Sequence, residues 1–325
     1  MQIVKKWNTS KHLITLGILV ILAILLYLFW EVSFHNMRLF TYAMEIRFPK
    51  LIVILIAAFS IGGASIIFQT IINNRIVTPC LLGMNSLYTL THTAVVFIAG
   101  SSSMFARNAN VAFFMDIVLM GSIATLTYSY LFKKTKYNVL YVLLIGTVLS
   151  SFFTSMQTTM TRIMDPNEYD ALLATLVASF ENINTEIIVF SILLLGGLII
   201  ALRKELALLD VIALGKNQAI NLGVDYDRCI RKLLLGVTLC IAVATAMVGP
   251  ISFLGLIIAN LARQLLKTYR HKDLILGTTL FGMIVLLGGQ AVVEHVFSYA
   301  IPISVFITIA GGIYFLYLLL TNRRV

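Results

Sequence analysis

The chain has 325 residues, of which 59% are hydrophobic and only 12% are charged, and its mean hydropathy is +0.95. Soluble domains are nearer half apolar and a quarter charged, so this composition excludes a soluble globular domain and indicates an integral membrane protein. The net charge of +10 does not require a nucleic-acid partner, because neither a clustered basic domain nor a recognition motif accompanies it.

Apolar blocks long enough to cross a bilayer recur along the chain, without the period-2 alternation of a membrane β-barrel. Hydropathy therefore predicts an all-α, polytopic membrane protein of about ten transmembrane helices, forming a single transmembrane domain over residues 1–325. A nine-span alternative omits the short eighth block and places the termini on opposite sides. The ten predicted spans are 12–30, 51–72, 81–99, 111–132, 137–155, 183–202, 233–250, 252–266, 274–293 and 303–320.

Basic residues are unevenly divided between the two sides that ten spans create. If both termini lie in the cytoplasm, 19 of the 24 lysines and arginines fall on the inside. The positive-inside rule predicts this asymmetry, so the sequence indicates a multi-pass membrane protein with cytoplasmic N- and C-termini. The five basic residues left outside are Arg38, Arg47, Lys50, Arg107 and Arg162.

The sequence lacks the motifs of several catalytic classes. The Gly215-Lys216 pair runs into Asn217 without the upstream glycine of a P-loop, so the chain is not expected to hydrolyse ATP. The five histidines are scattered, with no HExxH motif or paired cysteines, which argues against a catalytic metal site. We therefore expect a protein that is not an enzyme and binds no cofactor or metal directly.

Three carboxylates, Asp116, Glu186 and Glu294, lie in or directly beside predicted spans, each near the expected outer end. Charge at mid-bilayer is costly, so we interpret them as side chains that reach interfacial water. The alternative is the ion or proton pathway of a secondary carrier.

The longest predicted cytoplasmic loop, 203–232, has the pattern of two short helices. Asp210 is expected to cap the first, Gly215 to break it, and Gly223 to end a second turn that runs from Lys216 to Leu222. Such a loop would present an apolar side in water, which either contacts another protein or packs on its own helices. The residues of that side are Ala213, Leu214, Ala219, Ile220 and Leu222.

Hydroxyl residues recur on one face of the fifth predicted span, where they serve either helix packing or a polar path for cargo. The next segment, 168–180, is apolar but too short to span, as expected of a re-entrant or interfacial piece. The residues of the hydroxyl face are Thr147, Ser151, Thr154, Ser155 and Thr158.

Several motifs, in order, resemble the permease family of bacterial iron-chelate and cobalamin uptake systems, the FecCD-like membrane subunits of type II ABC importers. ALGKNQAINLGVD (213–225) is similar to that family's L-G-x-x-x-A-x-x-L-G loop, and GPISFLGLIIANLAR (249–263) to its G-P-I-G-F-V-G-L-I-V-P-H-x-x-R. The resemblance spans nearly the whole chain, and three further matches are RFPK (47–50), FQTIINNRIVTPCLLG (68–83) and the C-terminal IPISVFITIAGGIYFLYLLL.

The resemblance implies roles for particular residues. The loop is expected to dock on an ATPase subunit, and Arg47, Lys50 and the divergent Glu294 to lie where a substrate-binding protein docks. The alternative for Arg47 and Lys50 is that they anchor the chain at the membrane interface. Gln69 and the hydroxyl face of 147–158 are expected to line the translocation path. The implied ATPase-coupling residues are Leu214, Gly215, Lys216, Ala219, Leu222 and Gly223.

The chain also departs from the family pattern. Lys216 replaces a common Glu, Ala259-Asn260 replaces Pro-His, and Arg75-Ile76 replaces Pro-Leu. The usual G-S-L of the outer gate is Ala178-Ser179-Phe180. Because Glu294 falls where the family often has Arg, the docking surface is mixed in sign, which favours a non-identical second permease.

The implied function is that of a permease subunit of an ATP-binding-cassette importer in the bacterial cytoplasmic membrane. An iron-siderophore complex is the first choice of cargo, with heme or cobalamin as the alternative. The implied partners are two ATPase subunits that use ATP, a second permease and an extracytoplasmic binding protein. An ion-coupled secondary transporter is the alternative from a different class, and it would transport without an ATPase.

Overall fold

The computed structural model describes residues 2–32, 35–100, 103, 108–135, 139–180 and 184–321. Arg107 and the first residues of the predicted spans 137–155 and 183–202 lie outside these ranges. The described residues form α-helices and one 3-10 helix, and no strand occurs among them.

The helices follow one another with short connections. The order is α1 (Gln2–Phe29), α2 (Met37–Ile72), the 3-10 helix η1 (Cys80–Leu82), α3 (Met84–Ala99), α5 (Ala109–Lys134), α6 (Val139–Ile163), α7 (Pro166–Leu176), α8 (Thr185–Ala201), α9 (Arg203–Ala207), α10 (Leu209–Ile212), α11 (Lys216–Asn221), α12 (Tyr226–Val248), α13 (Leu254–Leu266), α14 (His271–His295) and α15 (Ile303–Thr321).

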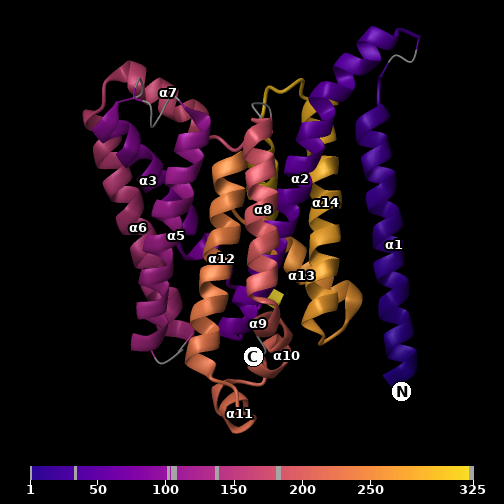
Figure 1. Ribbon diagram of the computed structural model, residues 1–325, viewed down its shortest axis with the longest axis vertical. Helices are drawn as coiled ribbons and strands as arrows, with labels where there is room; N and C mark the ends of the chain where they lie inside the picture. The colour runs from indigo at the N-terminus through magenta and orange to yellow at the C-terminus, as the bar shows by residue number, and fades with distance from the viewer. Residues whose placement is uncertain are drawn as a thin grey trace.

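Each of the ten predicted spans overlaps one or more helices of this bundle, which confirms the all-helical polytopic fold (Figure 1). Six described helices, α1, α2, α5, α6, α12 and α14, are long and apolar enough to cross a membrane individually. The others are shorter: α8, α13 and α15 are apolar helices below that length, and α3 has 16 residues.

The second helix is much longer than its predicted span, because hydropathy does not register its polar first part. It begins at Met37, where the Asn36 side chain accepts a hydrogen bond from the Arg38 backbone N–H, and it continues through Pro49. From Leu51 onward nearly every residue is buried, and α2 packs against α12, α13 and α14. α2 therefore forms the centre of the bundle.

The eighth predicted span is only partly helical. Its helix, α13, has 13 residues, about 20 Å in length, which is less than the hydrocarbon thickness. The preceding segment 249–253 is irregular: Gly249 has φ +91°, and a Cβ at this position would lie 2.8 Å from the Ala178 Cα. Non-helical backbone at membrane depth requires such burial within the protein.

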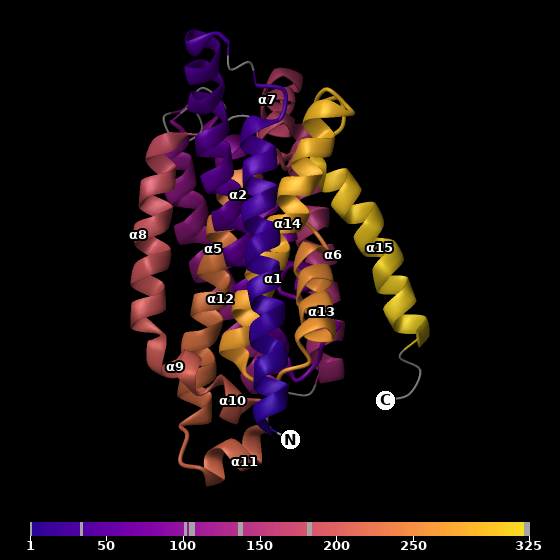
Figure 2. The same cartoon turned by 90° about the vertical axis from the view of Figure 1, so that its right-hand side faces the viewer.

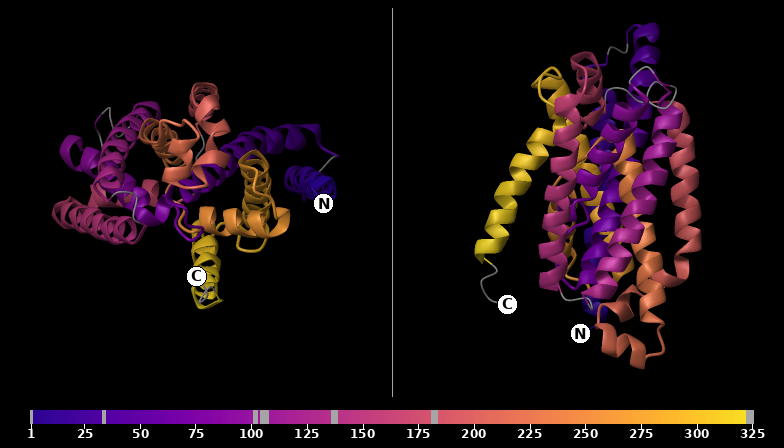
Figure 3. Two further views of the ribbon diagram at one scale, coloured as in Figure 1. Left: turned by 90° about the horizontal axis from the view of Figure 1, so that it is seen from below. Right: turned by 90° about the vertical axis from the view of Figure 1, so that its left-hand side faces the viewer.

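The two ends of the bundle are built differently. The start of α1, the end of α15 and the short helices α9–α11 lie at one end, and α7 lies at the other (Figure 2). We call these the loop end and the α7 end. Both ends of the described chain lie at the loop end, which agrees with an even number of crossings. α15 leans away from the other helices (Figure 3).

Candidate functional site

The loop end projects a small apolar tip beyond the bundle. Gly215, with φ +97°, breaks the chain between α10 and α11, and Gly223, with φ +84°, ends α11 in the left-handed conformation. Leu214 and Leu222 are 57% and 63% exposed, and Ile220 is also exposed. These three exposed residues, the apolar tip, offer apolar surface that a partner protein can cover.

Ala219 does not belong to this tip, although the sequence predicted it on the same apolar side. It is 0% exposed, and its backbone N–H and C=O bond to Gly215 and Val224. The physical reason is that a helix of only six residues needs a buried apolar side chain to hold it against the rest of the loop. Ala219 therefore seats α11, and the contact surface is made by its neighbours.

Charged side chains tie the loop segment 203–223 to the neighbouring spans. Lys216 pairs with Asp227 of α12 at 3.2 Å, and Lys232 of α12 pairs with Glu205 of α9. The hydrogen bond from Lys232 holds the pKa of the Glu205 carboxyl below its usual range. Lys216, where the family pattern has Glu, thus has a partner within its own chain.

The expectation that Asp210 caps the helix in which it lies is wrong. The N-cap position of α10 is Leu208, and the Asp210 carboxylate instead accepts the backbone N–H of His271 at 2.9 Å. The His271 ring also reaches the same oxygen through Nδ1. Asp210 therefore caps α14, a helix far away in the sequence.

At the α7 end, the three predicted docking residues face into the protein. Arg47 Nη1 donates to the carbonyls of Tyr27, Leu28 and Trp30 at 2.8–3.0 Å, and it thereby caps the last turn of α1. Lys50 and Glu294 form an ion pair at 3.7 Å whose side chains are only 9% and 5% exposed. The expected free docking charges are thus internally bonded, and the docking role stays a prediction.

The burial of Glu294 also corrects its interpretation as a carboxylate in interfacial water. Its Oε1 accepts hydrogen bonds from Tyr27 and from Gln290, each at 3.0 Å, in addition to the Lys50 charge. A buried carboxylate requires this number of partners to offset its lost hydration. Glu186, by contrast, is exposed as expected and bonds to Asn110.

The hydroxyl face of α6 is exposed along its whole length. Thr147, Thr154 and Thr158 donate to carbonyls within α6. Thr154 also reaches Ser86 of α3 at 3.3 Å. A shallow groove of about 460 Å³ follows this face near its end, lined by Thr154, Ser155, Thr158, Thr159, Arg162 and Ile163.

Gln69 lies away from that face. It is 2% exposed, donates to the Arg75 carbonyl at 2.7 Å and accepts from Arg263 at 3.4 Å. Asn260 donates to the same Arg75 carbonyl at 2.9 Å. Two departures from the family pattern, at Arg75 and Asn260, therefore meet at one hydrogen-bonded carbonyl, and in this conformation Gln69 lines no open path.

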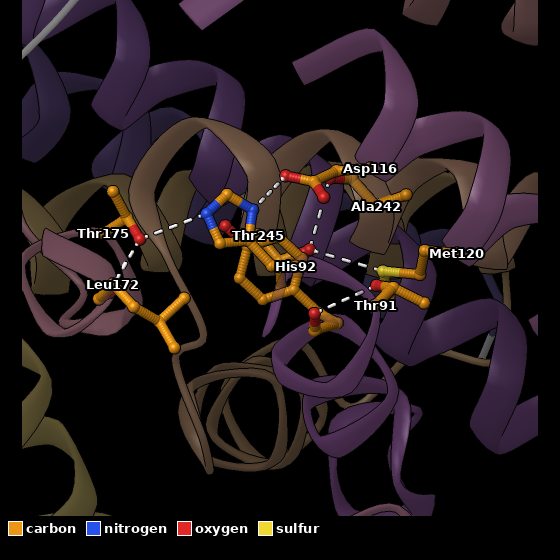
Figure 4. A network of polar contacts seen from close by, with 9 residues as sticks. Thr91, His92, Asp116, Met120, Leu172, Thr175, Ala242 and Thr245 are labelled. Carbon is orange, nitrogen blue, oxygen red and sulfur yellow. Dashed lines mark hydrogen bonds and ion pairs between the residues drawn. The ribbon is translucent and has the colours of Figure 1, made fainter. Parts of the chain in front are cut away.

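A third buried polar group joins α3, α5 and α7 (Figure 4). His92 Nδ1 lies 2.9 Å from Asp116 Oδ2, and His92 Nε2 lies 3.1 Å from the Thr175 hydroxyl. Asp116 is 3% exposed, so its interpretation as a carboxylate in interfacial water is wrong. His92, Asp116 and Thr175 line a cavity of about 300 Å³ beneath α7, together with Tyr88, which stacks on the His92 ring.

The Thr175 hydroxyl also lies 2.7 Å from the Leu172 carbonyl within α7. Both ring nitrogens of His92 and the buried Asp116 carboxyl therefore have polar partners, and the group ties α7 to α3 and α5.

Comparison with known proteins shows which family this chain belongs to. The model of the FecCD transport family matches residues 9–321. The chain belongs to the FecCD transport family. As an ABC importer permease of this family, it is a multi-pass protein of the cytoplasmic membrane that works with an ATPase and a substrate-binding protein.

Similarity to individual FecCD proteins extends over most of the chain. It is 40% identical over 319 residues to the petrobactin import system permease protein YclO of Bacillus subtilis (strain 168), which covers 98% of this chain and 99% of that protein. It is 31% identical over 280 residues to the petrobactin import system permease protein FatC of Bacillus anthracis, covering 85% and 78%.

A solved structure shares the FecCD fold. It is described as an inward-facing conformation of a metal-chelate type ABC transporter, and it superposes with a TM-score of 0.78 at 23% identity over 96% of this chain and 99% of that one. Identity at this level concerns the fold alone.

Sequence reasoning missed two polar groups of this FecCD chain, His92–Asp116–Thr175 and Asp210–His271. A histidine inside an apolar span was the available signal for the first, because intramembrane ionisable residues are rare and usually paired. No comparable signal existed for the second, since both residues lie at helix ends where charge is ordinary.

Proposed function

We propose that this chain is a permease subunit of an ATP-driven importer that carries an iron-siderophore complex across the bacterial cytoplasmic membrane, with ferric petrobactin as its cargo. The observation that carries the cargo assignment is the 40% identity to a petrobactin import permease along nearly the full length of both chains. The substrate of a permease depends on residues spread over many helices, so similarity over the whole length supports it better than any single motif.

The loop end faces the cytoplasm in this proposal. The apolar tip at Leu214, Ile220 and Leu222 projects beyond the bundle, where it would fit a cleft on an ATPase subunit. It lies within the predicted loop 203–232, which carries six of the chain's basic residues. The positive-inside rule supports a cytoplasmic location for such a loop. Two ATPase subunits would use ATP, and the permease itself would bind no cofactor.

A second, non-identical permease would complete the path. The hydroxyl face of α6 is not covered by the described part of this chain, and an apolar stripe of Tyr141, Leu144, Val148 and Phe152 runs beside it. Hydroxyls suit a wetted wall, whereas the stripe suits lipid or a partner helix. We assign Thr147, Ser151, Thr154, Ser155 and Thr158 to the path, and Gln69 to the packing that holds the Arg75 carbonyl after α2.

Transport would follow from nucleotide binding. Closure of the ATPase subunits pushes on the apolar tip, and the ties between the loop segment and the spans convert that push into a change of helix packing. Nucleotide shifts the population only as far as its affinity differs between the inward-open and outward-open states. Docking of the binding protein occurs at the α7 end, where Asp165 and Asp170 are exposed.

Reconstitution of the permease pair, the ATPase and the binding protein in proteoliposomes tests the proposal. We expect ATP-dependent uptake of radiolabelled ferric petrobactin that stops when the ATPase is omitted. Uptake driven by an ion gradient without the ATPase would instead identify a secondary transporter. ATP-dependent uptake of heme or cobalamin, but not of the siderophore, would overturn the cargo assignment and leave the importer class standing.

A further inference from the structure

The helices differ in how they are connected to the loop segment 203–223. α8 and α12 continue directly from it, so a displacement of the loop is transmitted to them through the backbone. α14 is separated from the loop by α12 and α13 in the sequence. The structure describes a polar contact that nevertheless joins the two: Asp210 of α10 with His271 of α14.

This contact secures the first turn of α14. The first backbone N–H groups of a helix have no partner within the helix, and the N-cap residue Arg270 makes no side-chain cap. Asp210 Oδ1 accepts the His271 N–H at 2.9 Å and the ring Nδ1 at 2.5 Å. Because an ionised carboxylate only accepts hydrogen bonds, Nδ1 carries the hydrogen. His271 is 5% exposed, so water competes little for these bonds.

Both partners are held by rigid surroundings. Leu209 and Ile212, on either side of Asp210, are buried in the main core, and α10 contacts α2. At the other end of α14, Glu294 pairs with Lys50 of α2. α14 has 25 residues, about 37 Å in length, and is therefore attached near the loop end to α10 and near the α7 end to α2.

We propose that Asp210 is a positioning residue that makes α14 move with the loop segment during transport. The inference rests on the proposed function, because it assumes that an ATPase pushes on the apolar tip. When the push displaces α10, the two hydrogen bonds draw the first turn of α14 with it. α14 transmits the displacement to the Lys50–Glu294 pair, and the α7 end responds. Without Asp210, the push reaches α12 through the backbone, but its direct polar route to α14 is lost and only packing through α2 remains.

The test is the number of ATP molecules hydrolysed per siderophore taken up by the reconstituted complex. Asp210→Ala is expected to leave ATP hydrolysis near the wild-type rate and to raise this ratio about tenfold, the size of a typical coupling between sites. Asp210→Asn is expected to restore most of the coupling, since the amide oxygen accepts the same two N–H groups. Asp273→Asn is the matched control. Asp273 lies in the first turn of α14, and its substitution by Asn removes one negative charge, as Asp210→Ala does.

An unchanged ratio in Asp210→Ala overturns the inference while leaving the importer function intact. Absence of ATP-dependent uptake by the wild-type complex counts instead against the proposed function.

A double variant, Asp210→Cys with His271→Cys, covers the case in which Asp210→Ala does not assemble. We expect crosslinking of the two cysteines with a bifunctional thiol reagent to restore siderophore uptake per ATP hydrolysed. When the crosslinker is cleavable, reduction of the same sample should reverse that gain. If bridging the two cysteines does not improve the ratio, the inference is wrong.

Discussion

The loop end and the α7 end use ion pairs of different kinds. At the loop end the Lys216 and Asp227 side chains are both exposed, at 39% and 62%, and Asp210 is 47% exposed beside the buried His271. At the α7 end two pairs are buried on both sides, at 9% and 5% for Lys50–Glu294 and 11% and 4% for His92–Asp116, whereas the surface pair His295–Glu31 has an exposed carboxylate, at 14% and 71%.

This difference has an energetic meaning. A pair whose two members are both exposed, such as Lys216–Asp227, exchanges easily with water and is worth about 0 to 1 kcal/mol, so it permits rearrangement at low cost. A buried pair cannot lose one partner without leaving an uncompensated charge, which costs several kcal/mol. The loop end is therefore suited to being displaced by a partner. The helices at the α7 end keep one packing until enough free energy is supplied to separate their buried pairs.

The largest expected effect is on the buried pair between α2 and α14. Lys50→Met leaves the Glu294 carboxylate without its counter-charge and is expected to lower the free energy of unfolding by about 3 kcal/mol. Thermal denaturation in detergent measures the change.

The double variant Lys50→Met with Glu294→Gln is the control for that prediction. It removes both charges at once and is expected to recover most of the loss, since no charge is left unpaired. A single variant that is no less stable than the double one would contradict the difference drawn between the two ends.

A smaller effect is expected at the apolar tip. Leu222→Asp places a charge on a 63% exposed side chain, so thermal stability should change by less than about 0.5 kcal/mol. Affinity for the ATPase subunit is expected to fall about tenfold, equivalent to about 1.4 kcal/mol. Titration of the detergent-solubilised permease with the ATPase measures it.

Asn221→Asp provides the matched control at the tip. Asn221 is an exposed neighbour of Leu222 in α11, and its substitution adds the same charge without removing apolar surface. If both variants weaken ATPase binding equally, charge rather than lost apolar contact explains the effect, and the tip is not a hydrophobic docking surface.

The smallest effect is expected for the tie between α7 and His92. Thr175→Val removes a hydroxyl that contacts His92 and Leu172, which should destabilise α7 by about 1 kcal/mol. Hydrogen exchange of the α7 amides should then be about fivefold faster, because opening of α7 is easier. Thr159→Val is the comparison, since the Thr159 hydroxyl donates within α6. Equal hydrogen-exchange rates of the α7 amides in the two variants would show that the contact between Thr175 and His92 does not stabilise α7.

The candidate site was predictable where a local pattern carries the information. The glycine spacing around 215–223 predicted the break and the end of α11, and both occur at the expected residues. Which side of α11 faces outward was not predictable, because Leu222 and Ala219 are both apolar and only packing decides between them. The same limit applies to Lys50 and Glu294, whose burial depends on helices distant in the sequence.

The membrane setting, the helical spans and the apolar, glycine-bracketed loop follow from the order of residues alone, because the free energy of transferring each segment into lipid is a local sum over its residues. The packed fold was needed to show that Asp210 caps α14, that His92 pairs with Asp116 and that Glu294 pairs with Lys50. Such contacts join side chains that are far apart along the chain, and their geometry exists only after the helices have packed.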